Sequence, residues 1–218
     1  MQFENILKNL PERFFLVGVD QQGDFFDLEG SNLPIPNSKQ IIQPTDEFLK
    51  ILRWSQCKGV LFTQDWHDAD WVERMPDGTP FDKHCEKDTE GAKIVVSYSF
   101  IPNPIPLYNL RKNVFDSWEE KDIEITAMDL VTKKSFVSTS RDKFFEDLIK
   151  DGMVDFVIMG VASDICVKFF IAGLFALAEK LSVEITVTVL DPFCKGLFRE
   201  MDQVIAEDFA GKNINLIK

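Results

Sequence analysis

Cys166 combines a reactive side chain with a position that favours reactivity. A strand-like apolar run over 154–159 ends in Gly-Val-Ala-Ser-Asp, and the cysteine follows where a helix should begin. The N–H groups and dipole of a helix N-terminus stabilise a thiolate, so a cysteine placed there can act as a nucleophile at neutral pH. The competing interpretation is a small packing residue, because free cysteines are often buried. The local sequence leaves both open.

Acidic and histidine side chains follow two further strand-like runs. The run at 14–19 ends in Asp20, and the run at 58–63 leads into Asp65 and His67. Such runs are typical of buried parallel strands, whose carboxyl ends form the ligand-binding edge of an open α/β sheet. We therefore expect the sulfur of Cys166 and these acidic and histidine side chains to meet at one edge of the sheet.

The elements that would position these residues alternate along the chain. Strand-length apolar runs occupy 14–19, 58–63, 93–98, 154–159, 183–190 and 213–217, and helical spacing marks 38–54, 141–151 and 165–180. Pro44 interrupts the first turns of the first helix. The alternation predicts βαβ crossovers and a single three-layer α/β/α sandwich over 1–218, with a mostly parallel central sheet. Residues 113–140 carry an acidic excess and are predicted to be an irregular insertion or lid, and a candidate contact with a second subunit in a homo-oligomer.

Composition narrows the class of protein. The 218 residues include 36 acidic and 24 basic ones, and the net charge of −12 argues against nucleic-acid binding. No run is long and apolar enough to span a membrane, and the first 13 residues do not resemble a secretory signal. Four cysteines in a chain of this size predict reduced thiols rather than a disulfide framework, and hence a cytoplasmic protein.

Four segments, in order, resemble the motifs of the isochorismatase-like cysteine hydrolases, and more narrowly of their nicotinamidase/pyrazinamidase branch. They are Asp20-Gln21-Gln22-Gly23-Asp24-Phe25, Thr63-Gln64-Asp65-Trp66-His67, His84-Cys85 with Thr89 and Gly91, and Gly160 to Val167. The resemblance extends from Phe14 to the strand near Val189 and implies the isochorismatase-like hydrolase fold. Each motif alone is modest, but the four together and in this order are specific.

The resemblance implies a catalytic set of Asp20, Lys112 and Cys166. Cys166 would be the nucleophile and Asp20 the proton shuttle, with a pKa raised by burial beside the thiolate. Lys112 is the nearest match to the catalytic lysine, with Lys93 and Arg111 as competitors. The backbone N–H groups of Ala162 and Cys166 would form the oxyanion hole, and a cis peptide is expected between Val161 and Ala162.

The resemblance also implies a metal site made by Asp65, His67 and His84. Residues two apart on a strand share a face, so Asp65 and His67 can converge on one ion. Two histidines and one carboxylate are typical of a catalytic zinc site, although iron and manganese are alternatives. In some members of the family a fourth protein ligand comes from the loop that matches 69–73 here. Glu73 is a candidate in this loop, but water is the favoured fourth ligand. The competing interpretation is that His67 caps a turn and His84 is exposed.

The activity implied is that of a metal-dependent nicotinamidase, which converts nicotinamide to nicotinate and ammonia through a Cys166 thioester and accepts pyrazinamide as a side substrate. Such a reaction belongs to pyridine nucleotide salvage. The resemblance assigns substrate binding to Phe25, Gln22, Phe81 and Val161. The alternatives are a related hydrolase acting on another small amide, a carbamoyl compound or isochorismate, and an inactive member acting as a binding module. Isochorismate cleavage would need no metal, and a missing lysine would favour the inactive member.

Overall fold

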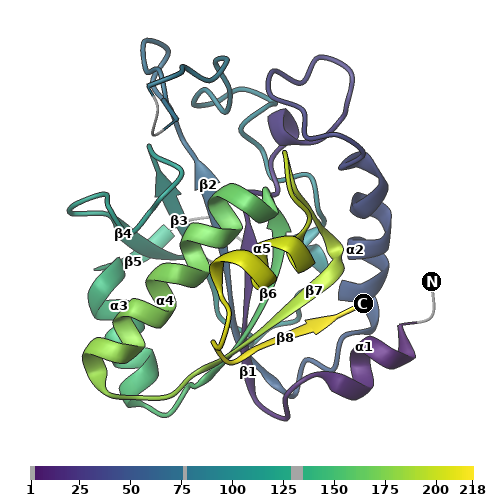
Figure 1. Cartoon of the computed structure of the whole chain (residues 1–218), viewed down its shortest axis with the longest axis vertical. Coiled ribbons are helices and arrows are strands. Elements are labelled where there is room, and N and C mark those ends of the chain that lie inside the picture. Colours follow the sequence, from purple (N-terminus) through teal and green to yellow (C-terminus); the bar gives the residue numbers. More distant parts are fainter. Residues whose placement is uncertain (1–2, 76–77, 129–134) are drawn as a thin grey trace.

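The computed structural model describes residues 3–75, 78–128 and 135–218, and a single sheet runs through the middle of them (Figure 1). Its strand order is β5-β4-β3-β2-β1-β6-β7-β8. The strands are β1 (Phe14–Val19), β2 (Cys57–Asp65), β3 (Leu107–Lys112), β4 (Glu124–Met128), β5 (Ser135–Ser140), β6 (Asp155–Val161), β7 (Thr186–Lys195) and β8 (Ile214–Ile217). The six neighbouring strands β3, β2, β1, β6, β7 and β8 pair in parallel. Strands β4 and β5 are added antiparallel at the β3 edge.

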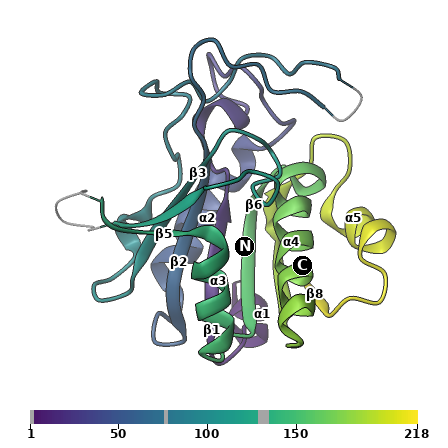
Figure 2. The same cartoon turned by 90° about the vertical axis from the view of Figure 1, so that its left-hand side faces the viewer.

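Helices cover both faces of the sheet. They are α1 (Glu4–Asn9), α2 (Lys39–Ile51), α3 (Arg141–Lys150), α4 (Lys168–Leu181) and α5 (Met201–Asp208). Side chains of α3, α4 and α5 pack on one face with Phe15 and Val17, and those of α1 and α2 pack on the other with Phe14 and Leu16. This alternation along β1 is that of a strand buried on both sides. Figure 2 shows α4 and α5 together on one side of the sheet.

The predicted fold class is confirmed, because the sheet is mostly parallel and lies between two helical layers. Some elements differ from the prediction. Residues 93–98 form no strand, and Ile94 makes only an isolated bridge to Gln22. Helix α2 runs through Pro44, which was expected to interrupt its first turns. The helices α1 and α5 and the edge strands β4 and β5 are additional to the predicted elements.

The segment 113–140 includes regular structure. Strands β4 and β5 pair antiparallel, from Glu124 opposite Ser140 to Met128 opposite Ser135, while 129–134 lie outside the described residues. An edge hairpin faces solvent on one side, so its sequence shows less apolar periodicity than a central strand. This explains why the periodicity of the segment predicted no strands.

Trp118 fixes the first part of this segment to α4. Its indole Nε1 donates a hydrogen bond to the carbonyl of Phe170 over 3.1 Å, and the guanidinium of Arg141 lies 4.9 Å from the ring centre. The ring packs so closely on Gly173 that a Cβ there would lie 2.1 Å from an indole atom. The loop that leaves β3 is therefore held against the helix that follows Cys166.

Cysteine pairing and helix length are also clear in the described part of the chain. All four cysteines are unpaired and buried, which agrees with the reduced thiols predicted from the sequence. None of the helices described has both the length and the apolar character needed to span a membrane.

We predict that Gly173→Ala destabilises the fold, although alanine is the better helix former by about 1 kcal/mol. The added methyl group must displace the indole of Trp118, and overpacking of this kind costs about 1–3 kcal/mol. Urea unfolding should show a net loss of stability. In a Trp118→Leu background the same substitution should cost nothing or stabilise slightly, and an equal loss in both backgrounds would contradict the predicted contact.

Candidate active site

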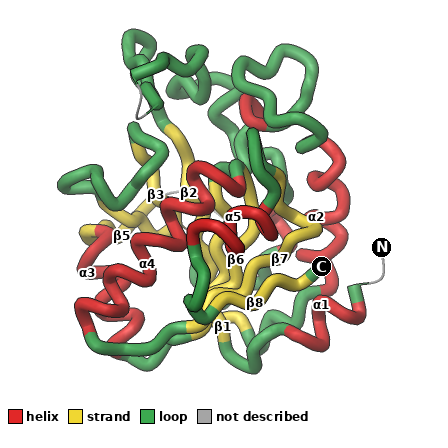
Figure 3. Tube along the Cα trace, in the orientation of Figure 1, coloured by secondary structure: helices red, strands yellow, loops and turns green. Residues whose placement is uncertain are grey.

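The functional side chains gather where the strand order changes direction. From β1 the chain proceeds outward through β2 and β3 on one side, whereas β6, β7 and β8 follow on the other. Ligands of open α/β folds bind in the crevice at the carboxyl ends of such strands. Asp20 follows β1, Asp65 ends β2, Lys112 ends β3 and Cys166 follows β6. Long loops cover this end of the sheet, at the top of Figure 3.

Asp20, Lys112 and Cys166 meet inside this crevice. The ammonium of Lys112 lies 2.8 Å from Asp20 Oδ2 and 3.8 Å from Cys166 Sγ, and it also donates to Asp65. The hydroxyl of Thr63 donates to Asp20 Oδ1 over 2.5 Å. The side chains of Asp20 and Lys112 are almost completely buried. The sulfur is thus within reach of a cation that is itself paired with the proposed proton shuttle.

The two competitors of Lys112 lie elsewhere. Lys93 is exposed and pairs with Glu90. Arg111 neighbours Lys112 on β3, but the alternation of a strand directs its side chain to the other face, where it stacks 3.8 Å above the ring of Trp66. Of the three cations considered from the sequence, the structure brings only Lys112 to Cys166.

Burial controls the protonation of these groups. It raises the pKa of Asp20, and the charge of Lys112 opposes that shift. Burial also raises the pKa of the Cys166 thiol well above its ordinary value, although Lys112 again acts in the opposite direction. Cys166 lies in a π-helical turn, Ser163–Val167, that leads into α4, so the expected position near the start of a helix is found. Burial acts against ionisation of the thiol at this position, whereas Lys112 favours it.

The buried ammonium of Lys112 keeps its charge. Burial acts to lower its pKa, but Asp20 and Asp65 outweigh this effect and raise the pKa well above its ordinary value. The same ammonium, together with the two histidines, holds the pKa of Asp65 below its usual range although burial acts to raise it. At neutral pH the centre therefore combines one fixed cation, one fixed carboxylate and a thiol–carboxyl pair that can exchange a proton.

A second cluster joins Asp65 to His67, His84 and Glu73. One ligand atom from each of the four lies within 4.8 Å of all the others, and all four side chains are buried. The Nε2 atom of His84 is 3.6 Å from Asp65 Oδ2 and 3.3 Å from Glu73 Oε2, and the Nε2 atom of His67 is 3.9 Å from both oxygens. The four residues thus surround one point.

The spacing and chemistry of this cluster fit a divalent metal ion. Four ligands at zinc distances of about 2.0–2.2 Å in a tetrahedron are separated by about 3.3–3.6 Å, close to the separations found. Asp65 Oδ2 and His67 Nε2 are buried without a hydrogen-bond partner in the described structure, which is costly unless an ion binds them. The Nδ1 atom of His84 lies 2.7 Å from the carbonyl of Asp82, a contact that orients Nε2 toward the cluster.

The electrostatics of the cluster also favour a positive charge. Burial lowers the pKa of His84, but Asp65 and Glu73 outweigh it and raise the pKa to about 10. Burial lowers the pKa of His67 to about 4, so this ring is neutral and free to bind a metal. Glu73 lies with Asp65, His67 and His84, at the position where water was favoured over Glu73 from the sequence. Nothing in its spacing from His67 fixes the path of the intervening loop.

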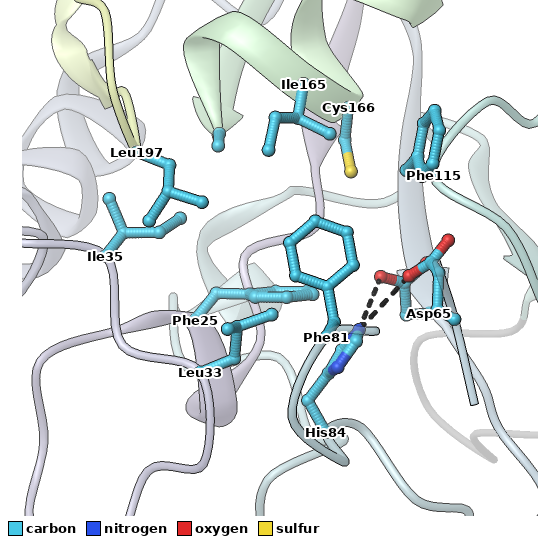
Figure 4. A pocket seen from close by; sticks show the side chains of 12 residues that line it. Phe25, Leu33, Ile35, Asp65, Phe81, His84, Phe115, Ile165, Cys166 and Leu197 are labelled. Atoms are coloured by element: carbon cyan, nitrogen blue, oxygen red, sulfur yellow. Dashed lines mark ion pairs between the residues drawn. The ribbon is translucent and has the colours of Figure 1, made fainter. Parts of the chain in front are cut away.

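One apolar cavity connects the sulfur to the metal-site residues (Figure 4). Its walls contain the predicted Phe25 and Phe81, and Ala162, Cys166, Asp65 and His84 also border it. The sequence did not assign five further residues that line it, namely Leu33, Ile35, Phe115, Ile165 and Leu197. Apolar residues of loops carry no sequence signal that identifies the cavity to which they belong.

The structure does not bring Gln22 or Val161 to the cavity wall. The side chain of Gln22 donates to the carbonyls of Asp65 and Ala92 and accepts from the N–H of Asp65, so it orders the end of β2. Val161 is buried in the apolar cluster at the end of β6. The peptide between Val161 and Ala162 is cis, as expected, and it precedes the turn that carries Cys166.

Comparison with known proteins supports the motif assignments. No family model matches the chain. The chain is 25% identical over 199 residues to the nicotinamidase of Escherichia coli, covering 80% of this chain and 81% of the relative. Among solved structures it is similar to the zinc complex of the pyrazinamidase of Pyrococcus horikoshii (24% identity, TM-score 0.61, 95% and 99% of the two chains). It is also similar to N-carbamoylsarcosine amidase from Thermoplasma acidophilum (17% identity, TM-score 0.59, 94% and 97%).

These relatives cover 80–95% of the chain. The predicted enzyme class, an amidohydrolase acting on a linear carboxamide, agrees with them. The solved structures, at 17–24% identity, support the fold, and the nicotinamidase of Escherichia coli supports the branch. The resemblance to the isochorismatase-like cysteine hydrolases is therefore confirmed, and the chain is similar to their nicotinamidases and pyrazinamidases.

Proposed function

We propose that the protein is a metal-dependent nicotinamidase, which hydrolyses nicotinamide to nicotinate and ammonia and accepts pyrazinamide as a second substrate. One observation carries the proposal. Lys112 of the buried Asp20–Lys112–Cys166 group also pairs with Asp65, which belongs to the four-residue candidate metal site, and both groups border one apolar cavity. A nucleophile and a metal site that share a cavity can act on two parts of one small molecule.

The character of the cavity favours an uncharged aromatic amide. Phe25, Phe81 and Phe115 provide flat walls on which an aromatic ring can pack, and Ile165 and Leu197 add aliphatic surface. Among the described residues that line the cavity there is no lysine or arginine. Isochorismate and carbamoyl amino acids carry carboxylates, and the described lining of the cavity offers them no lysine or arginine side chain of its own.

The proposed chemistry begins with the thiol. Asp20 accepts the proton of Cys166 as Sγ attacks the carboxamide carbon, and the N–H groups of Ala162 and Cys166 stabilise the oxyanion that forms. Asp20 then returns this proton to the leaving nitrogen, which departs as ammonia, and a thioester remains on Sγ. The raised pKa of Asp20 suits it to both transfers. The ammonium of Lys112 lies beside both groups and offsets the negative charge, whether that charge is on Asp20 or on the sulfur.

Hydrolysis of the thioester uses Asp20 again, first as a base and then as an acid. Asp20 deprotonates a water molecule that attacks the acyl carbon, the C–S bond breaks, and the proton returns to the sulfur as nicotinate leaves. Asp65, His67, Glu73 and His84 would hold a divalent ion, zinc being the choice best suited to two nitrogen and two oxygen ligands. When bound, this ion would supply a Lewis acid for the ring nitrogen of the substrate, as a ligand added to the four protein side chains, and would so orient the carboxamide.

We predict that Cys166→Ala lowers ammonia release from nicotinamide by about 10³-fold or more, because no other group can form the thioester. Purified protein should be assayed with saturating nicotinamide. Cys194→Ala is the matched control, since Cys194 is also buried but lies outside the cavity. Unchanged turnover by Cys166→Ala would exclude the thioester mechanism.

We predict that Lys112→Met abolishes activity and lowers the free energy of unfolding by about 3–5 kcal/mol, because it leaves two carboxylates buried without their cation. Lys93→Met is the control. Its ion pair with Glu90 is exposed and contributes at most about 1 kcal/mol. Urea unfolding and ammonia release should be measured for both variants, and similar effects of the two would argue against the assigned cation.

We predict that a chelator removes activity and that zinc restores it. Glu73→Gln should weaken zinc binding by at least about 10-fold, because it replaces a charged ligand with a neutral one. Zinc affinity can be measured by competition with a chromophoric chelator, using Asp70→Asn as an exposed acidic control from the same loop. If Glu73→Gln binds zinc with the affinity of the wild type, Glu73 is not a ligand and the fourth ligand is water.

A further inference from the structure

Asp164 belongs to the π-helical turn Ser163–Val167 that carries Cys166, but the proposed chemistry gives it no role. It lies two residues before Cys166 in the π-helical turn and is 6% exposed. Its carboxylate accepts three consecutive backbone N–H groups. Leu197 N donates to Oδ1 over 2.9 Å, and Phe198 N and Arg199 N donate to Oδ2 over 2.8 and 2.9 Å.

These three donors belong to the loop between β7 and α5, more than 30 residues farther along the chain. The loop turns tightly at Gly196, where a Cβ would lie 1.8 Å from the carbonyl oxygen of Arg199. A carboxylate that accepts several N–H groups forms strong, charge-assisted hydrogen bonds. Asp164 thus joins the turn that presents the nucleophile to a distant loop.

The loop so held contributes one wall of the cavity. Leu197 lines the cavity and packs in the cluster that contains Val161, Ala162 and Ile165. Figure 4 shows Leu197 beside Ile35, across the cavity from Phe115 and Asp65. The next side chain, Phe198, is 71% exposed and is absent from this wall. The three hydrogen bonds therefore fix which side chain of the loop faces the cavity.

We propose that Asp164 is a positioning residue that determines substrate affinity by holding Leu197 against the cavity beside Cys166. This inference rests on the proposed amidase function of the same cavity. It separates two tasks within one turn: Cys166 reacts, and Asp164 shapes the apolar wall against which the substrate ring packs. Asp164 touches no reacting atom and acts only through the backbone of 197–199.

The Asp164→Asn variant tests this role with the smallest change of shape. An amide has one acceptor oxygen, and its NH₂ group would face a backbone donor, so part of the three-donor contact is lost. We expect KM for nicotinamide to rise about 10-fold while kcat changes less than about 3-fold, the pattern of weakened binding in both the ground and transition states. Leu197→Ala should give a similar KM increase.

A double-mutant cycle distinguishes positioning from a general loss of stability. If Asp164 acts through Leu197, the Asp164→Asn/Leu197→Ala protein should have a KM no more than about 2-fold above either single variant. Phe198→Ala is the control, because it keeps the backbone donor and removes only an exposed side chain, and its KM should equal that of the wild type. Multiplicative effects of the two substitutions, or an unchanged KM in Asp164→Asn, would overturn the proposal.

Two measurements need no nicotinamide turnover. Native-state hydrogen exchange should be slow at the amides of Leu197, Phe198 and Arg199 and at least about 10-fold faster in Asp164→Asn, with the amides of β6 unchanged. Alkylation of Cys166 by iodoacetamide should be faster in both Asp164→Asn and Leu197→Ala, because the wall beside the sulfur is opened.

The combined outcomes separate the two proposals. If the wild type releases no ammonia but exchange and alkylation change as expected, the nicotinamidase function fails and the role of Asp164 in the cavity wall stands. If wild-type exchange at 197–199 is as fast as in exposed loops, or alkylation is the same in all variants, the role of Asp164 fails, whatever the activity of the wild type.

Discussion

The centre of this protein depends on one buried ammonium. Lys112 pairs with Asp20 and Asp65, and without it two carboxylates would lie desolvated within a few ångströms of each other. Removing such charges from water costs several kcal/mol each, so their burial is tolerated only with an opposite charge between them. Because Asp65 also belongs to the group formed with His67, Glu73 and His84, the same cation links the proposed nucleophile to the candidate metal site. The two halves of the centre are therefore electrostatically coupled.

The sheet supplies the geometry that this coupling requires. Asp65 and Lys112 are opposite residues of the parallel pair β2–β3, so backbone register alone brings their side chains together. Asp20 and Cys166 come from β1 and β6, which are also neighbours. Four chain segments, spread from Asp20 to Cys166, thus meet at one edge with little contribution from flexible loops. A rigid scaffold of this kind holds reacting groups more accurately than loops do.

Residues at the ends of strands were those most accessible to prediction from the sequence. Asp20, Asp65 and Cys166 each follow or end an apolar strand, and the topology of a parallel sheet brings such positions together. Lys112 ends the less apolar strand β3 and was chosen among three cations through the family resemblance. The limits of prediction lie in the loops. The position of Glu73 depends on the path of a loop, and Leu197 reaches the cavity through contacts made far along the chain. Gln22 resembles a pocket residue in sequence, but its amide satisfies the backbone of Asp65, a task that no local pattern specifies.

The buried, protonated state of Cys166 has a consequence for how the protein would age in the presence of oxidants. Hydrogen peroxide reacts with thiolates, and a thiol whose ionisation is suppressed by its surroundings is a poor target. In the proposed mechanism the sulfur becomes strongly nucleophilic only as its proton passes to Asp20, during attack on a bound amide. Burial of the thiol would then protect it from irreversible oxidation between turnovers, and each catalytic cycle would require a proton transfer to Asp20.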